Sequence, residues 1–413
     1  MKKAIVILLC VLCVIQFSGC RQPQTQTAQP STQSTIPPET VPVIGSQTAE
    51  TTAPQSMNTP LDHAQIQSDL DSIAKKYNAV GMQVAIVENG QVVGTYAYGW
   101  ATRKTVPMTT DHKIRVASIS KVVVGISAML LYEDGLIDLE GDIGDVWGVT
   151  ARNPMFPDHP INIWNILSHT SSIASYEDDV SVEYRRVLNR LPYSFWSVEP
   201  GTMKGRCYNN YAFRVLGMTV ELAANKTMDT ILDEHLFNTM QIDAAFASGD
   251  VDDLSLLATL YEGTYVRRSV AKQATFHSSD IPGGSGSYFA GGLTISAKDL
   301  GKLAALLAND GMYDGQQLIQ PETVALMEQC MEQPMRNGAY QAHPMFHVPG
   351  LYGREGVYFH TGSGCGVHTC FSYDDATGDG VVILTTGAAG YMNELEISLI
   401  CDEINTYVYD LLK

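Results

Sequence analysis

Three short motifs contain residue types that together could carry out nucleophilic catalysis. They are Ser118-Ile119-Ser120-Lys121, Tyr208-Asn209-Asn210 and His360-Thr361-Gly362-Ser363. A serine hydroxyl needs a base to attack a carbonyl carbon at neutral pH. Each motif alone is a weak signal, because Ser72-Ile73-Ala74-Lys75 and Tyr391-Met392-Asn393 repeat two of the patterns. The elements around each copy therefore decide which copies could act.

The two S-x-x-K copies fall in different predicted elements. Residues 64–77 have the apolar spacing of an amphipathic surface helix, so the copy at Ser72 is interpreted as accidental. Residues 113–116 lead instead into a long apolar helix that starts near Ser118 and ends before Gly135. A helix there places Lys121 one turn beyond Ser118, on the same face.

Lys121 can act as the base for Ser118 only if it is neutral. Lowering a lysine pKa from about 10.4 to 7 corresponds to roughly 4–5 kcal/mol, which requires burial or nearby positive charge. The helix start would also offer the free N–H of Ser118 to a developing oxyanion. The alternative interpretation is a helix-capping serine followed by a surface lysine.

The second motif precedes a predicted helix over residues 210–224. The Tyr208 hydroxyl could relay a proton between serine, lysine and leaving group. Asn210 could hold Lys121 and a substrate amide in place. The alternative is a buried tyrosine followed by a helix-capping asparagine.

The third motif ends a predicted edge strand. Gly362 allows substrate backbone to approach closely, and His360 and Thr361 would contact the substrate. The N–H of Ser363, with that of Ser118, would form a two-donor oxyanion hole. The alternative is an ordinary strand end followed by a glycine-rich turn.

Strand patterns lie at both ends of the chain and surround a helical middle. A hairpin is predicted from residues 82–87 and 92–98, and three more strands from residues 358–361, 367–373 and 380–385. Helices are expected over residues 161–167, 299–309 and 394–412. The pattern predicts an α+β fold, in which one antiparallel sheet built from both chain ends is flanked by helices and joined to a mostly helical lobe at roughly 135–285.

The first residues read as a secretory signal. Lys2 and Lys3 precede an apolar run, and Ser18-Gly19-Cys20 resembles a bacterial lipobox. We expect residues 1–20 to be a lipoprotein signal peptide and Cys20 to be the lipid anchor of an extracytoplasmic protein on a bacterial membrane. Residues 21–56 have the composition of a disordered tether, leaving residues 57–413 as the globular domain. Without lipidation the protein would be secreted.

The charge and the cysteine content argue against several other classes of protein. The net charge of −18 argues against nucleic-acid binding. Five cysteines remain after Cys20, an odd number, so buried free thiols are favoured over a disulfide framework, although Cys365 and Cys370 could pair. No cysteine spacing indicates a metal site. The acidic run 374–380 lacks the spacing of a calcium loop and favours a hairpin turn.

The three motifs in this order resemble the serine beta-lactamase, penicillin-binding protein and D-aminopeptidase superfamily, in its class C-like branch. The similarity covers roughly residues 64–412. It includes Leu167-Ser168-His169-Thr170-Ser171, Pro200-Gly201-Thr202 and Ala290-Gly291-Gly292-Leu293. The chain departs from the pattern in having two extra residues before Tyr208, and Ser172-Ile173 in place of Gly-Leu.

The resemblance implies roles for these residues. Ser118 would be the acylated nucleophile, Lys121 its base and Tyr208 the proton relay, while His169 would be structural. His360 stands where lactamases carry lysine, which lowers the expectation of efficient beta-lactam hydrolysis. A histidine there binds a carboxylate only when protonated, so we expect carboxylate-bearing substrates to bind better below about pH 6.5.

The sequence therefore predicts a serine hydrolase working through an acyl-enzyme on D-amino-acid peptides, cell-wall fragments or small esters. The alternatives are a true beta-lactamase, and a penicillin-recognising sensor without efficient turnover. No cofactor is implied, and we expect a monomer.

Overall fold

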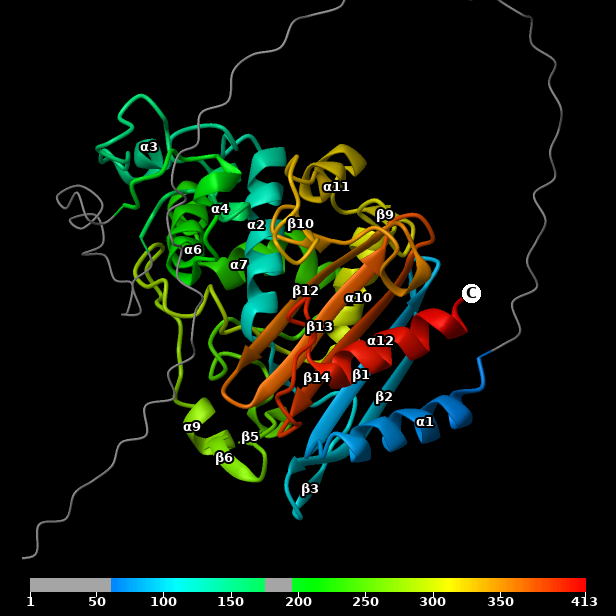
Figure 1. The fold of residues 1–413 in the computed structure, drawn as a ribbon. Helices are drawn as coiled ribbons and strands as arrows, with labels where there is room; N and C mark the ends of the chain where they lie inside the picture. The colour runs from blue at the N-terminus through cyan, green and yellow to red at the C-terminus, as the bar shows by residue number, and fades with distance from the viewer. Residues whose placement is uncertain (1–60, 175–194) are drawn as a thin grey trace, which may run out of the picture. The chain divides into compact units, whose positions relative to one another are not determined.

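The computed structural model describes residues 61–174 and 195–413, and its centre is one antiparallel sheet (Figure 1). The strands lie in the order β10-β11-β12-β13-β14-β1-β2-β3. Their bounds are β1 (Gly81–Glu88), β2 (Gln91–Thr102), β3 (Val106–Pro107), β10 (Tyr340–Gln341), β11 (Phe346–His347), β12 (Val357–Gly364), β13 (Val367–Asp374) and β14 (Asp379–Thr386).

Shorter strands and the helices complete the described fold. The small strands are β4 (Ile114–Arg115), β5 (Leu260–Glu262), β6 (Tyr265–Arg268), β7 (Thr294–Ile295), β8 (Met312–Tyr313) and β9 (Gln316–Gln317). The helices are α1 (His63–Lys76), α2 (Ser120–Glu133), α3 (Ile143–Trp147), α4 (Ile163–Leu167), α6 (Asn210–Ala224), α7 (Met228–Leu232), α8 (Asn238–Met240), α9 (Val270–Gln273), α10 (Ala297–Ala308), α11 (Pro321–Glu328) and α12 (Leu399–Leu411).

Both ends of the chain build the sheet, as predicted. β1 lies between β2, its hairpin partner, and β14 from the C-terminal region. The hairpin turns at Asn89 (φ 50°) and Gly90 (φ 71°), the left-handed pair that a two-residue turn requires. The α+β prediction is therefore confirmed.

Helices cover both faces of this sheet. α1 and α12 lie against each other across one face, where Leu70, Ile404 and Val408 are buried with the sheet residues beneath them (Figure 1). α10 packs on the other face, in a core that continues into α2 and α6 of the helical middle. The predicted helical lobe thus lies beside the sheet and shares one core with it.

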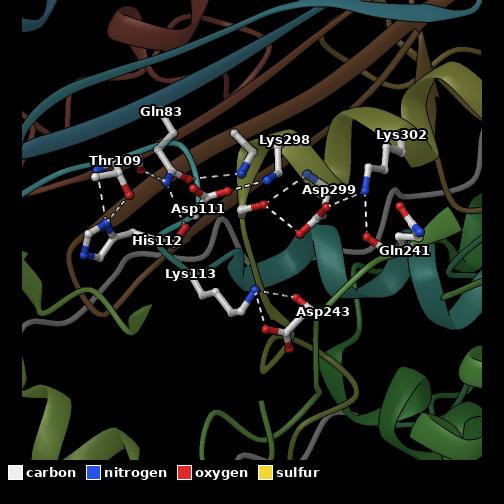
Figure 2. A network of polar contacts seen from close by, with 12 residues as sticks. Gln83, Thr109, Asp111, His112, Lys113, Gln241, Asp243, Lys298, Asp299 and Lys302 are labelled. Carbon is white, nitrogen blue, oxygen red and sulfur yellow. Dashed lines mark hydrogen bonds and ion pairs between the residues drawn. The ribbon is translucent and has the colours of Figure 1, made fainter. Parts of the chain in front are cut away.

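A buried glutamine fixes the segment that leads to the first motif. Gln83 of β1 donates through Nε2 to the carbonyl oxygens of Thr109 (2.6 Å) and His112 (2.8 Å), and accepts from the N–H of Ala297 (Figure 2). Lys113, which is 3% exposed, pairs with Asp243 at 2.8 Å. These contacts hold the chain just before β4 against the sheet, α10 and the helical lobe.

Several predicted helix starts differ from the structure: α4 begins at Ile163 and not at residue 161, and α10 begins at Ala297 and not at residue 299. Ser118 lies in a 3-10 turn, residues 117–119, and α2 begins at Ser120. The last helix begins at Leu399 and not at residue 394, because the Asn393 side chain accepts from the N–H groups of Leu395 and Ile397 and holds them in a loop.

The remaining expectations have mixed outcomes. The described cysteines Cys207, Cys330, Cys365, Cys370 and Cys401 are free thiols, as favoured, but only the last two of these are buried and the other three are half-buried. The acidic run at 374–380 is a turn whose buried Asp374 and Asp379 both pair with Arg354.

The expected signal peptide, Cys20 anchor and tether lie outside the described residues. Within residues 61–174 and 195–413, no helix has the length and apolar character needed to cross a membrane.

Candidate active site

The backbone before Ser118 is held in an unusual conformation. Ala117 has φ 49°, a left-handed geometry that is costly for a residue with a side chain and is found at sites where surrounding contacts enforce it. The Ser120 hydroxyl donates to the carbonyl oxygen of Ala117 (2.7 Å) and accepts from the N–H of Leu293 (3.0 Å). Ser118 is thereby presented, partly exposed, just before α2.

Lys121 reaches the Ser118 hydroxyl from the first turn of α2. Its Nζ lies 3.1 Å from Ser118 Oγ and donates to the carbonyl oxygen of Ala290 at 2.7 Å. The side chain is fully buried, with Nζ 4.9 Å from the ring centroid of Tyr208 and 5.8 Å from that of Phe213. The alternative of a surface lysine is therefore excluded.

The surroundings of Lys121 favour the neutral amine. Burial lowers the pKa of Lys121 well below its usual range, and the positive charges of Arg214 and Arg115 lower this pKa further. Arg115 is itself held by the carbonyl oxygen of Gly291. A neutral lysine 3.1 Å from a serine hydroxyl can accept its proton.

Tyr208 lies against both members of this pair. A hydrogen bond joins it to Ser118, and its ring centroid is 4.4 Å from that of His169. His169 accepts the N–H of Asn209 at Nδ1 (3.1 Å), and its carbonyl oxygen accepts from the N–H of Cys207. His169 thus fixes the backbone on both sides of Tyr208, in agreement with a structural role.

Burial separates the acid and base roles. It raises the pKa of Tyr208 well above its ordinary value, an effect that the hydrogen bond with Ser118 only partly opposes. Tyr208 is therefore a protonated phenol at neutral pH, while burial and the nearby arginines favour the neutral form of Lys121. The lowered pKa of Lys121 suits the role of base, and the raised pKa of Tyr208 keeps its hydroxyl available as a proton donor.

The edge of β12 closes the other side of the site. A Cβ on Gly362 would lie 2.2 Å from the carbonyl oxygen of Val116, so only glycine allows this approach to the segment before Ser118. The Thr369 hydroxyl donates to the same Val116 oxygen at 2.9 Å. Ser363 is exposed on this strand beside the turn that contains Ser118. The expected oxyanion donors, the N–H groups of these two serines, thus come from adjacent elements.

His360 cannot supply the expected cation. The side chain is 1% exposed, and its Nδ1–H donates to the carbonyl oxygen of Thr361 at 2.7 Å. Burial lowers the pKa of His360 to about 3. The expectation that a protonated His360 strengthens carboxylate binding below about pH 6.5 is therefore wrong, because sequence alone does not reveal this burial.

We expect KM for a carboxylate-bearing substrate to show no step between pH 5 and pH 8 that depends on His360, since the imidazole is already neutral over this range. The measurement is KM against pH for the wild type and His360→Gln. A fall in the wild-type KM below pH 6.5 that is lost in the variant would contradict this.

Asn210 occupies a different place from the one expected. The helix cap is Asn209, whose side chain accepts from the N–H of Ala212 and donates to the carbonyl oxygen of Ile173. Asn210 is the exposed first residue of α6, and the hydrogen bonds of Lys121 go to Ser118 and Ala290. The expected role in holding Lys121 is therefore not seen, whereas contact with substrate stays a prediction.

The decoy motifs lie apart from the site. Ser72 is exposed on α1, where its hydroxyl donates to the carbonyl oxygen of Ser68 at 2.9 Å. Tyr391 is 71% exposed in the loop before α12. Sequence reasoning did not assign the carbonyl oxygen of Ala290 or the cations Arg115 and Arg214. In the described residues, no group of three or more potential metal ligands is present.

Comparison with known proteins agrees with this geometry. The family model described as Beta-lactamase matches residues 66–397. The chain belongs to the beta-lactamase family. The superfamily resemblance is thereby confirmed, and the chain is a beta-lactamase-related serine hydrolase with Ser118 and Lys121 in contact.

Relatives in this family differ in their activities. The chain is 25% identical to penicillin-binding protein 4 of Amycolatopsis lactamdurans, over 79% of this chain and 86% of that protein. It is 27% identical to a D-aminopeptidase of Brucella anthropi, over 50% of this chain and 40% of that protein. Its fold is similar to a penicillin-binding protein homologue from Caulobacter crescentus, with TM-score 0.68 and 18% identity over 85% of this chain and 98% of that structure.

Proposed function

We propose that the protein is an extracytoplasmic serine hydrolase that works through an acyl-enzyme on Ser118. The observation that carries this proposal is the 3.1 Å contact between Ser118 Oγ and the fully buried Nζ of Lys121. A lysine that is neutral in the folded protein is costly for stability and useful as a base. An acylation reaction also needs a presented nucleophile and donors for the oxyanion. The Ala117 backbone presents Ser118, and the end of β12 carries Ser363, whose N–H is one of the two expected oxyanion donors.

The reaction follows from these positions. Lys121 accepts the Ser118 proton as Oγ attacks the substrate carbonyl carbon, and the carbonyl electrons move to an oxyanion facing the N–H groups of Ser118 and Ser363. As the oxyanion collapses, the bond to the leaving group breaks, and Tyr208 donates its proton to that group. Tyr208 recovers a proton from Lys121. Water then attacks the ester carbonyl carbon while Lys121, neutral again, accepts a proton from the water. As this second oxyanion collapses, the bond to Ser118 Oγ breaks, Oγ takes the proton back from Lys121, and the acid is released.

The proposed substrates are D-amino-acid peptides, cell-wall fragments or small esters. The D-aminopeptidase relative supports a D-amino-acid substrate. The neutral His360 disfavours efficient beta-lactam hydrolysis. A second candidate, a penicillin-recognising protein that is acylated without efficient turnover, is supported by the relative named penicillin-binding protein 4.

The proposed location rests on the sequence. The short apolar run that ends at Ser18-Gly19-Cys20 supports export and lipid attachment at Cys20, and residues 21–56 would serve as the tether.

The test offers the purified chain four compounds separately: p-nitrophenyl acetate, D-alanine p-nitroanilide, L-alanine p-nitroanilide and benzylpenicillin. Product release is followed by absorbance and acylation by intact mass. Turnover of the ester or of the D-anilide over the L-anilide is expected. A stable penicillin adduct without turnover of any compound would favour the second candidate, and rapid consumption of benzylpenicillin would indicate a lactamase. No reaction and no adduct would contradict the proposed function.

A further inference from the structure

The protein is acidic overall, yet among the described residues an arginine beside the catalytic groups has no carboxylate partner in an ion pair. Arg206 precedes Tyr208 by two residues and is partly buried. Its Nε and Nη2 both donate to Oε1 of Gln341, at 2.9 and 2.7 Å. Its guanidinium carbon lies 5.9 Å from the ring centroid of Phe346.

Gln341 is a rigid and neutral acceptor. Its Nε2 donates to the carbonyl oxygens of Ala342 (2.8 Å) and Met345 (3.2 Å), and the residue is fully buried. These bonds fix which end of the amide faces Arg206. In the part of the chain that the structure describes, no carboxylate forms an ion pair with Arg206 and no hydrogen bond uses its Nη1. Glu396 acts on Arg206 only through its charge at longer range.

The positive charge of Arg206 is therefore only partly compensated by its surroundings. Removing a guanidinium from water is costly unless a negative group compensates it, and buried charges in proteins are normally paired. An amide oxygen and an aromatic face compensate only in part. The fork formed by Nη1 and Nη2 matches the two oxygens of a carboxylate.

Arg206 is on the same side of the site as His360. The Phe346 ring, beside Arg206, has its centroid 5.2 Å from that of His360, and the His360 and Tyr208 ring centroids are 6.4 Å apart. The charge of Arg206 also lowers the pKa values of His169 and His360, which places it within electrostatic reach of both. A carboxylate near His360 would meet a neutral ring there and a permanent cation at Arg206.

We propose that Arg206 binds the carboxylate of the substrate, and so selects acyl donors with a free C-terminal carboxylate. This inference rests on the proposed function, since it assigns the substrate class of the same site. Arg206 is a specificity-determining residue in the segment that carries two extra residues before Tyr208. It takes the role that a cation at position 360 would have.

The test compares a peptide ending in D-Ala-D-Ala with the same peptide carrying a C-terminal amide. For the wild type we expect a KM about 10-fold to 100-fold lower for the free carboxylate, the range of a charge-assisted hydrogen bond. Arg206→Gln is expected to raise KM for the carboxylate peptide by that factor relative to KM for the amide peptide, so that the preference for the free carboxylate is lost. Arg206→Lys should restore part of the preference.

Lys204→Gln is the matched control, because Lys204 is exposed, two residues earlier, and loses the same charge. Equal losses on both peptides in Arg206→Gln, or the same effect from Lys204→Gln, would overturn the proposal. Binding without turnover is measured by calorimetry, with both peptides titrated into Ser118→Ala and into Ser118→Ala combined with Arg206→Gln. The proposal predicts that the second substitution weakens the affinity for the carboxylate peptide more than the affinity for the amide peptide. A chain that binds the carboxylate peptide through Arg206 but neither cleaves it nor becomes acylated would contradict the proposed function alone.

Discussion

Replacing Ser118 with alanine is expected to lower kcat/KM for ester hydrolysis by about 10⁴-fold or more, and to abolish the acyl adduct with benzylpenicillin or substrate. The loss is large because Ser118, Lys121 and Tyr208 act as one unit, and removal of the nucleophile leaves only binding and oxyanion stabilisation. The measurement is steady-state hydrolysis together with intact mass after brief exposure to the compound.

The chain supplies its own control for this experiment. Ser72 begins a second S-x-x-K on the exposed face of α1, and its hydroxyl is bonded to the backbone of that helix. Ser72→Ala should therefore retain wild-type activity and the full mass adduct. An adduct that persists in Ser118→Ala, or that is lost in Ser72→Ala, would assign the nucleophile elsewhere.

Much of the fold was predictable because its signals are local. The hairpin of β1 and β2 follows from alternating residues around Asn89 and Gly90, and α1 from the apolar stripe of Ile66, Leu70 and Ile73. The predicted start of α12 was wrong because the Asn393 side chain accepts backbone hydrogen bonds from the preceding loop, and the apolar periodicity of the sequence does not indicate these bonds.

The site was predictable where spacing along the chain determines contact. Ser118 and Lys121 meet because they are three residues apart at a helix start. The partner of Lys121, a backbone oxygen of Ala290, has no side-chain signature, and Arg115 comes close only through the fold. The neutral state of His360 likewise depends on burial, which residue type alone does not indicate.

Lys121→Met is expected to lower kcat/KM by about 10²–10⁴-fold, the range for loss of a positioned base. In the wild type, kcat/KM should rise with pH until Lys121 loses its proton, and this rise should vanish in the variant. Lys75→Met is the matched control, because Lys75 is the exposed lysine of the second S-x-x-K. Unchanged activity in Lys121→Met would exclude Lys121 as the base.

The same variant separates catalysis from folding. The folded-state pKa of Lys121 is lowered, so the unfolded chain binds more protons than the folded one between that pKa and about 10.4, and the free energy of unfolding rises with pH there. At pH 7 the burial of Lys121 therefore costs stability. We expect Lys121→Met to be at least as stable as the wild type in urea unfolding, with a weaker dependence on pH. An inactive variant with undiminished stability identifies Lys121 as a residue kept for its chemistry, whereas a parallel loss of stability would assign it a structural role.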